Sequence, residues 1–520
     1  MRQPRGEGAA GTPCDGGVAA TTWRVNANVS RTLLVVWSLA LFAATLALHL
    51  RHRDFAWYYH SDEGSKIEQV VSGKWNFNHP MLLLRAAKIA LDLRGAPRDP
   101  QSIVEIGRAV SATFTALAVV AFSLFAFQWR SWLAALSAGG ALMLHHQLFE
   151  LSHYMKEDTA LLFGLSLALL ALGLFEARPS LAKALALGAA CALAISGKYI
   201  GAIVLLATGP TLLKAPGKLR RATFFTGLIA VLLIVNWPLI SDFDTFRASL
   251  AQETQYVVEG QKGSTRSVPH AAYWNVFIDN TTPAIWLLLI LFIAARWGGW
   301  SAITLTRWHA VAFPFYYALM LSFSPKENDR YFLPATAMFT VLAALAVPDV
   351  ARLFQRKWAA PLAAILLVLG QLPSWLRYEH AFQTDDSREL QAWCREHLAA
   401  DAAIAKDSRI WLPDPKKKDG VPMDAIPQKV VPAKFAADLG TLEELRAKGI
   451  THVAVSESDY GRFFRESLRP KKGEEADFYR RKTFYEALFR DSDPVFQRDR
   501  GTMLYLHPGI RVYEIARNAR

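Results

Sequence analysis

Residues 33–64 read LLVVWSLALFAATLALHLRHRDFAWYYHSDEG. The first part, 33–50, is apolar and lacks Asp, Glu, Lys and Arg, and it has nearly the length of a helix that crosses a bilayer. An aromatic and acidic run that ends in Asp62 and Glu63 follows shortly after it. Two carboxylates just past the end of a membrane span predict an enzyme that works at the outer face of a membrane.

Ten further apolar segments come after the first one, and 52% of all residues are hydrophobic. We therefore predict an all-α polytopic membrane protein of about 11 transmembrane helices. The predicted spans are 33–50, 104–127, 133–149, 158–175, 183–197, 199–213, 223–240, 283–296, 309–323, 331–350 and 358–376.

The short segments 183–197 and 199–213 form either a tight hairpin or one broken helix. Counted as a hairpin, the alternate loops of the chain carry most of the Lys and Arg residues between spans, as cytoplasmic loops do. The pattern favours the hairpin and predicts a cytoplasmic N-terminus and an extracytoplasmic C-terminus. The composition suggests a bacterial inner membrane.

The formal net charge of +13 is spread over these loops and the tail. Because the cations form no single stripe, membrane lipids are the expected partner and nucleic acid is not.

The chain divides into three expected parts: a disordered cytoplasmic leader over 1–32, a membrane domain over 33–376, and an extracytoplasmic α/β domain over 377–520. The membrane domain includes two outer loops, 51–103 and 241–282.

Within these parts the sequence predicts several local structures. Residues 81–91 are typical of a helix in the headgroup plane, and 241–282 of a mobile lid or binding loop. In the tail we expect a helix that begins at Asp386, and strands at 402–405, 451–455 and 510–515.

Charged residues gather at the outer ends of the predicted spans. Because charges near hydrocarbon are costly, their collection on one side predicts a shared cavity. Carboxylates and cations together suit a substrate that has a hydroxyl to deprotonate and a phosphate to hold. The residues are Asp62, Glu63, Arg108, Glu150, Lys156, Asp158, Lys198, Lys326 and Arg330.

The order of these motifs resembles the GT-C membrane glycosyltransferases, in the branch of the protein O-mannosyltransferases and the lipid A aminoarabinose transferase. The resemblance covers about residues 30–350. It rests on Asp62-Glu63, Ser72-Gly73, Asn78-His79-Pro80, Arg108, Asp158, Gly197-Lys198-Tyr199 and Lys326-Glu327-Asn328-Asp329-Arg330-Tyr331-Phe332-Leu333-Pro334. The sequence departs from the commonest pattern in having one proline after His79 rather than two.

The resemblance implies transfer of a sugar, with inversion, from a polyprenyl phosphate to an acceptor hydroxyl outside the cytoplasmic membrane. Asp62 is the expected general base, which a carboxylate can be because the transition state acidifies the hydroxyl. Glu63 and Asp158 are expected to assist it.

Cations are expected to hold the leaving phosphate, without a protonating acid. The candidates are Lys326 and Arg330, then Arg108 and Lys198. His79, Tyr59 and Tyr331 are expected to contact the acceptor or the sugar. The acceptor is unknown, no cofactor is certain, and a divalent metal is possible.

Simpler interpretations stay open for the same residues. The acidic pair can be solvated, Asp158 can cap a helix, the cations can anchor helix ends in headgroups, and the aromatic residues around Tyr59 can form an interfacial belt. His146, Glu150 and His153 share a helical face and fit either a metal site or a polar mouth. A transporter or flippase of lipid-linked sugars, and a non-catalytic scaffold, are the competing functions.

Overall fold

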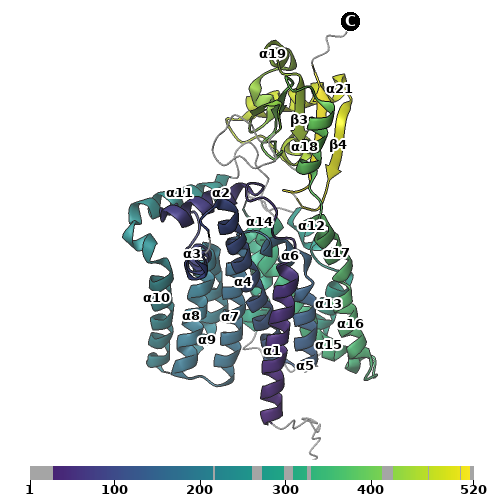
Figure 1. Cartoon of the computed structure of the whole chain (residues 1–520). Helices are drawn as coiled ribbons and strands as arrows, with labels where there is room; N and C mark the ends of the chain where they lie inside the picture. The colour runs from purple at the N-terminus through teal and green to yellow at the C-terminus, as the bar shows by residue number, and fades with distance from the viewer. Residues whose placement is uncertain are drawn as a thin grey trace, which may run out of the picture. The chain divides into compact units, whose positions relative to one another are not determined.

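The computed structural model describes residues 27–95, 97–214, 217–259, 272–297, 308–324, 329–412, 426–466, 468–503 and 505–515. It contains two compact units, Met1–Ala40 and Leu41–Arg520. Helix α1 (Ala27–His49) begins in the first unit and ends in the second. All other described elements lie in the second unit (Figure 1).

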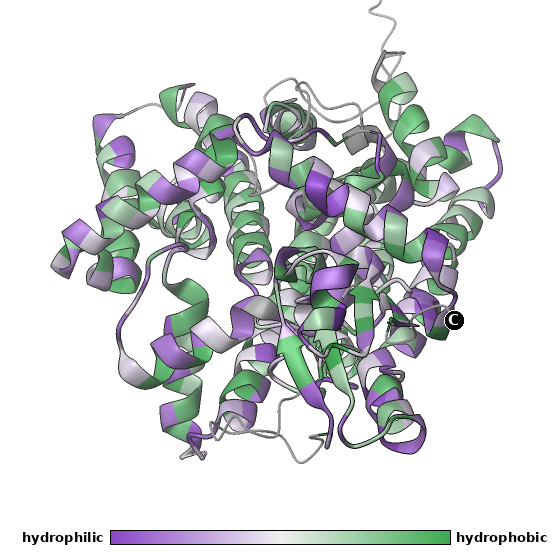
Figure 2. Cartoon of the chain, turned by 90° about the horizontal axis from the view of Figure 1, so that it is seen from above, coloured by the Kyte–Doolittle hydropathy of each residue, from purple (hydrophilic) through white to green (hydrophobic). Residues whose placement is uncertain are grey.

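Apolar helices make up most of the second unit, and hydrophobic residues predominate on them (Figure 2). They are α4 (Pro100–Trp129), α5 (Trp132–Met143), α6 (His146–Ser152), α7 (Glu157–Ala177), α8 (Leu181–Gly197), η1 (Tyr199–Ile203), α9 (Val204–Lys214), α10 (Lys218–Ser241), α13 (Pro283–Trp297), α14 (Trp308–Ser322), η3 (Asp329–Phe332), α15 (Leu333–Leu353), α16 (Ala359–Leu369) and α17 (Leu372–Ala381).

Six helical stretches among the described residues are long and apolar enough to cross a membrane: Arg31–His49, Pro100–Trp129, Glu157–Ala177, Lys218–Ser241, Asp329–Leu353 and Ala359–His397. Each predicted span falls on helix, which confirms a helical, polytopic membrane protein. The count of eleven is not established by these six.

Large apolar side chains on the outside of α10 fit this environment. Phe225, Ile229, Ile234 and Trp237 are each more than half exposed. An exposed apolar face of this kind suits contact with lipid tails.

Two predicted spans are interrupted. Segment 133–149 contains the end of α5 at Met143 and the start of α6 at His146, and segment 358–376 contains the break between α16 and α17. The chain turns back between α8 and α9, where Cys191 Sγ lies 3.9 Å from Thr208 Oγ1 across the turn. This geometry matches the hairpin interpretation of 183–213.

Helices α7, α8 and α10 pack with their backbones in near contact. A Cβ atom built on Gly164 of α7 would lie 2.2 Å from the backbone nitrogen of Ala194 in α8. One built on Gly188 of α8 would lie 2.0 Å from the backbone oxygen of Phe224 in α10. Glycine permits these approaches, as in other membrane helix pairs.

Two helices, α2 (Ser61–Ser72) and α3 (Leu82–Arg94), form the outer segment that follows α1. Helix α3 confirms the helix predicted over 81–91. The segment predicted as a mobile loop over 241–282 contains α11 (Phe243–Glu259) and α12 (Ala272–Asp279) instead. The described parts of this segment are thus helical, and residues 260–271 lie outside the description.

The tail contains a five-stranded mixed sheet in the order β2-β1-β3-β5-β4. Its elements are α18 (Asp386–His397), β1 (Ala403–Lys406), β2 (Lys429–Pro432), η4 (Ala436–Leu439), α19 (Leu442–Ala447), β3 (His452–Ser456), α20 (Glu457–Tyr460), η5 (Gly461–Phe463), α21 (Glu475–Asp491), β4 (Pro494–Arg500) and β5 (Pro508–Glu514). Strand β1 pairs in parallel with β2 and β3, whereas β5 is antiparallel to β3 and β4.

The expected helix and three expected strands are α18, β1, β3 and β5, so the prediction of a small α/β domain is correct in kind. Strands β2 and β4 were not predicted. Leu390 and Cys394 of α18 pack in one hydrophobic cluster with Ile404 of β1. Tyr485 and Leu488 of α21 belong to a second cluster.

Candidate active site

Asp62 and Glu63 lie in the first turn of α2. The sequence had placed them in an outer loop. His60 caps the helix, because its Nδ1 accepts a hydrogen bond from the backbone nitrogen of Asp62 at 3.1 Å. The partial positive charge of a helix N-terminus favours carboxylates at these positions. Since neighbouring residues of a helix point in different directions, the two carboxylates enter different surroundings.

Glu63 and Arg108 form a fully buried ion pair. The Arg108 guanidinium on α4 donates to both oxygens of Glu63, at 3.1 Å from Nε and 2.6 Å from Nη2, and both side chains are 0% exposed. The same guanidinium donates to the carbonyl oxygens of Arg53 at 2.7 Å and Phe55 at 2.5 Å. Glu63 also accepts from the backbone nitrogen of Met155 at 2.8 Å. This pair therefore ties together the chain before α2, helix α4 and the turn before α7.

Asp62 occupies the open side of α2. Its Oδ2 is in contact with Nζ of Lys156, the residue that precedes α7. The Asp62 side chain is 45% exposed, whereas that of Lys156 is 1% exposed. Asp62 thus presents a carboxylate to the outside that is held by a buried ammonium.

The two groups change each other's acidity. Burial is the largest single effect on Asp62 and raises its pKa, but the charge and hydrogen bond of Lys156, together with the charges of His60 and Lys66, outweigh burial, and the pKa of Asp62 lies well below its ordinary value. Burial, and then the nearby charges of Arg330 and Lys66, lower the pKa of Lys156 to about 7. Because this pKa is close to neutral pH, an anion bound beside Lys156 would readily shift the amine to its charged form.

Asp158 lies next to this pair, in the first turn of α7. It accepts a hydrogen bond from Nζ of Lys198 at 2.7 Å, and Nε of Arg330 lies 3.9 Å from its other oxygen. Nζ of Lys198 also lies 4.6 Å from the centre of the Tyr331 ring. Three parts of the chain that are distant in sequence therefore meet around one carboxylate.

Besides the Glu63–Arg108 pair and the cluster around Asp158, a third set of charged side chains is formed by Lys66, Glu157 and His79. Nζ of Lys66 contacts Glu157 Oε1 at 2.7 Å and donates to the carbonyl oxygen of Met155 at 2.5 Å. His79 Nε2 lies 3.9 Å from the other oxygen of Glu157, and burial lowers the pKa of His79 to about 4. The sequence analysis missed Lys66 and Glu157, although one lies a helical turn after Asp62 and the other directly precedes Asp158.

The tail domain contacts the segment that leads into α2. Tyr59 donates a hydrogen bond of 2.5 Å to Asp385, the residue that caps α18. The Tyr58 ring stacks on Trp411 with their centroids 3.8 Å apart. A similar contact joins His60 to Tyr505, with centroids 4.1 Å apart. The hydroxyl of Tyr59, which was expected to bind sugar, is thus bonded to the tail domain.

The contacts above join the expected site residues in separate groups: Glu63 with Arg108, Asp158 with Lys198 and Arg330, and Tyr331 with Lys198, while Asp62, His79 and Tyr59 have Lys156, Glu157 and Asp385 as partners. Lys326 lies outside the described residues. His146 bonds to Asn280, and both ring nitrogens of His153 lie near backbone carbonyls. No three His, Cys, Asp or Glu side chains within the described ranges gather as a metal site would require.

Comparison with known proteins agrees with this architecture. Residues 100–245, which contain Arg108, Asp158 and Lys198, match the family model of the dolichyl-phosphate-mannose-protein mannosyltransferases. No protein with a curated description matches the chain.

Among solved structures, ArnT from Cupriavidus metallidurans bound to undecaprenyl phosphate is similar, with 14% identity, a TM-score of 0.51 and coverage of 94% of this chain and 98% of that one. The Archaeoglobus fulgidus oligosaccharyltransferase in the apo form matches at 11% identity and a TM-score of 0.47, over 82% of this chain and 70% of that one. The S. cerevisiae protein O-mannosyltransferase Pmt1-Pmt2 complex matches at 20% identity and a TM-score of 0.33, over 47% and 36%. On the whole-length likeness to ArnT and the matched family segment, the chain has the fold of the GT-C membrane glycosyltransferases.

Proposed function

We propose that the protein is an inverting glycosyltransferase that moves a sugar from a polyprenyl phosphate to an acceptor hydroxyl at the outer face of the membrane. The observation that carries this proposal is the contact of the half-exposed Asp62 with Lys156, next to the cluster of Asp158, Lys198 and Arg330. A carboxylate that can accept a proton thereby lies beside several cations that can hold a phosphate.

In the proposed reaction, Asp62 takes the proton of the acceptor hydroxyl as its oxygen attacks the anomeric carbon. The bond between that carbon and the phosphate oxygen breaks in the same step, and the bonding electrons leave with the phosphate. One displacement of this kind inverts the anomeric configuration. Because the leaving group is a stable anion, cations suffice to stabilise it.

The charges around Asp62 suit this leaving group. Lys156, Lys198 and Arg330 outnumber the carboxylates of Asp62 and Asp158, so this cluster has an excess of one positive charge. A phosphate beside Lys156 would compete with Asp62 for its ammonium group. The pKa of Asp62 would then rise, and the carboxylate would become a stronger base once the donor is bound.

Glu63 and Arg108 take a different part in this proposal from the one that the sequence suggested. The Arg108 guanidinium is engaged with Glu63 and with the carbonyl oxygens of Arg53 and Phe55, and both members of the pair are fully buried. In this proposal Glu63 and Arg108 position α2, and Arg330, Lys198 and Lys156 bind the phosphate. Lys326, which the sequence favoured, remains a further candidate.

The acceptor side of the site is assigned to the residues that border Asp62 and the tail. His79 lies next to Glu157, and Tyr331 lies beneath the ammonium of Lys198. With the N-terminus in the cytoplasm of a bacterium, this side would face the periplasm and accept lipid, glycan or protein hydroxyls.

The proposal is tested with purified protein, a lipid-linked sugar donor made with radiolabelled sugar, and the Asp62→Asn variant. Transfer should fall by at least about 10²-fold, because the base is lost and the shape is kept. Binding of undecaprenyl phosphate should remain. Glu68→Gln serves as the matched control, since Glu68 is an exposed carboxylate on the same helix. Full transfer activity in Asp62→Asn would refute the proposed base, and donor movement across vesicles without transfer would favour a flippase.

A further inference from the structure

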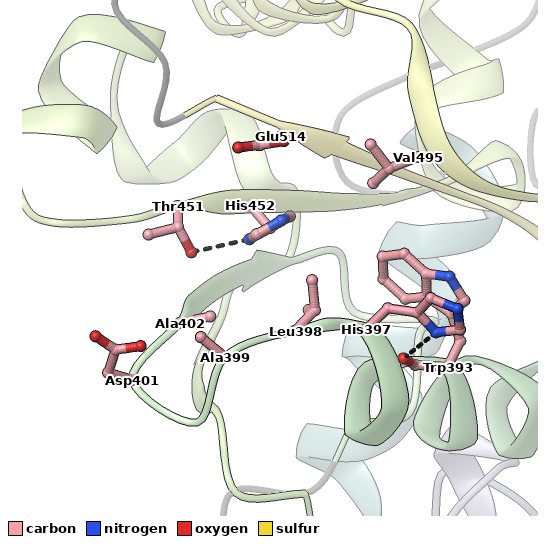
Figure 3. A pocket seen from close by; sticks show the side chains of 10 residues that line it. All are labelled: Trp393, His397, Leu398, Ala399, Asp401, Ala402, Thr451, His452, Val495 and Glu514. Carbon is pink, nitrogen blue, oxygen red and sulfur yellow. Dashed lines mark hydrogen bonds between the residues drawn. The ribbon is translucent and has the colours of Figure 1, made fainter.

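A cavity of about 340 Å³ lies at one end of the tail sheet, where β1 and β3 begin and β5 ends (Figure 3). The other end of β1 leads to Trp411, which stacks on Tyr58 near the site. The four residues of β1 span about 13 Å, so the cavity is separate from the cluster around Asp62. Its volume lies near the lower bound of about 300 Å³ for small-molecule sites.

An aromatic pair forms one wall of this cavity. The rings of Trp393 and His397, on the last turns of α18, stack with centroids 5.4 Å apart and planes 12° apart. The His397 Nδ1 atom lies 3.1 Å from the carbonyl oxygen of Trp393, and the indole also packs against Phe496. These contacts hold a flat, partly exposed surface in a fixed orientation, to which an apolar face of a ligand can pack.

Polar side chains form the opposite wall, as Figure 3 shows. His452 of β3 lies directly across from Glu514 of β5, and Thr451 Oγ1 lies 2.9 Å from His452 Nδ1. Asp401 is exposed at the far side from the aromatic pair. Burial lowers the pKa of His452, so its imidazole is neutral near pH 7. The ten residues around the cavity include neither Lys nor Arg, so it lacks the cations that bind a phosphate.

We propose that this cavity binds an uncharged sugar unit of a glycan, apart from the reacting atoms. A pyranose has apolar C–H faces for the aromatic wall and hydroxyl groups for carboxylates and imidazole. Hydrogen bonds from sugar hydroxyls to carboxylates are charge-assisted and give the orientation. The site would hold part of a glycan on the tail domain while transfer takes place at the cluster around Asp62, and binding there does not require the transfer reaction.

The test uses the full-length protein in a detergent without a sugar headgroup. Maltose, mannobiose and N,N′-diacetylchitobiose are the probes, and saturation-transfer NMR measures their binding. At least one disaccharide should bind, and His397→Ala and Asp401→Asn should each weaken it about tenfold, which corresponds to about 1.4 kcal/mol. Both side chains are exposed, so these variants should fold.

Arg395→Ala is the matched control, because Arg395 is exposed on the same helix and does not border the cavity. Asp62→Asn should bind the disaccharide as strongly as the unaltered chain, which separates this site from the proposed transfer site. The absence of binding by all three disaccharides would overturn the proposal. So would equal binding in the His397→Ala/Asp401→Asn double variant, or binding of ethanolamine in place of the sugars.

Discussion

The neighbouring carboxylates of helix α2, Asp62 and Glu63, differ in their exposure and in their partners. On the buried side, Glu63 is 0% exposed and is held by both arms of Arg108 and a backbone N–H. On the open side, Asp62 is 45% exposed and contacts the ammonium of Lys156. A buried, fully bonded pair fixes geometry, whereas a half-exposed carboxylate can exchange protons. Glu63 thus suits a structural role, whereas its neighbour Asp62 suits a chemical one.

The largest effect should come from breaking the buried pair. Glu63→Gln leaves the Arg108 charge uncompensated, and should lower the free energy of unfolding by about 3–5 kcal/mol. Asp62→Asn should cost less than about 1 kcal/mol, because Asp62 is 45% exposed to water and the buried amine of Lys156, whose pKa is about 7, can lose its proton once its partner is gone. The reactivity of Cys191, which is a buried free thiol in α8, reports the opening of the membrane helices during denaturation.

The double variant Glu63→Leu/Arg108→Met is the control for this comparison. It removes both charges together and should recover most of the lost stability. If Glu63→Gln proved as stable as Asp62→Asn, the assignment of separate roles to the two sides of α2 would be wrong.

A third carboxylate sharpens the comparison, since Asp407 of the tail is buried without an ion pair among the described residues. It accepts hydrogen bonds from the backbone nitrogens of Ala436 and Ser456, at 2.6 and 2.8 Å, and from Tyr485 at 2.9 Å. Burial, and then the charge of Asp459, raise the pKa of Asp407 to about 7.

Because this pKa is raised on folding, its contribution to stability is complete below the ordinary pKa of Asp and is lost as the pH rises through about 7. The tail should therefore lose on the order of 3 kcal/mol between pH 4 and pH 7. The labelling rate of the buried Cys394, relative to that in Asp407→Asn at each pH, measures this loss. A ratio that does not change with pH would contradict it.

A smaller effect is expected from Lys156→Met, which removes the partner of Asp62. The charge of Lys156 holds the pKa of Asp62 down, so without it the acid limb of the transfer rate should move to higher pH, by about one unit or more. Lys156→Arg keeps the charge and should leave the limb in place. The pH profile of kcat/KM measures this shift. If the acid limb did not move in Lys156→Met, the ionisation of Asp62 would not control the transfer rate.

The smallest effect concerns the junction with the tail. Tyr59→Phe removes the hydrogen bond to Asp385 and should destabilise the tail by about 1 kcal/mol. Arg388→Ala, which removes a mostly exposed ion-pair partner of the same carboxylate, should have less effect. The temperature at which Cys394 becomes reactive compares the two variants, and a larger shift in Arg388→Ala would reverse this assignment.

Most of the fold was predictable from sequence, because long apolar runs indicate membrane helices and short, almost wholly buried runs such as β1 and β3 indicate central strands. Strand β4 was not, since most of its residues are exposed and Phe496 alone is buried. Strand β2 is short and half-buried, with equally little pattern.

The members of the site were partly predictable, whereas their pairing was not. Asp62 and Asp158 stood out as acids beside membrane spans. Lys66 in the middle of α2 and Glu157 at the start of α7 resemble ordinary charged positions of helices in sequence, and only packing shows that they bond to each other. The same holds for Arg108, which lies 45 residues from Glu63 in sequence, and no local pattern distinguishes a structural partner from a ligand for phosphate.

The backbone-to-backbone packing of α7, α8 and α10 restricts how the prenyl chain of the proposed donor would reach the charged cluster. Gly164 and Gly188 bring neighbouring backbones into near contact, so a hydrocarbon tail cannot pass between α7 and α8, or between α8 and α10, at these two points. The lipid of the proposed donor would reach the cluster by a path that avoids these two contacts. Enlarging either glycine would therefore disturb the scaffold that carries Asp158 and Lys198 without obstructing the route by which the substrate enters.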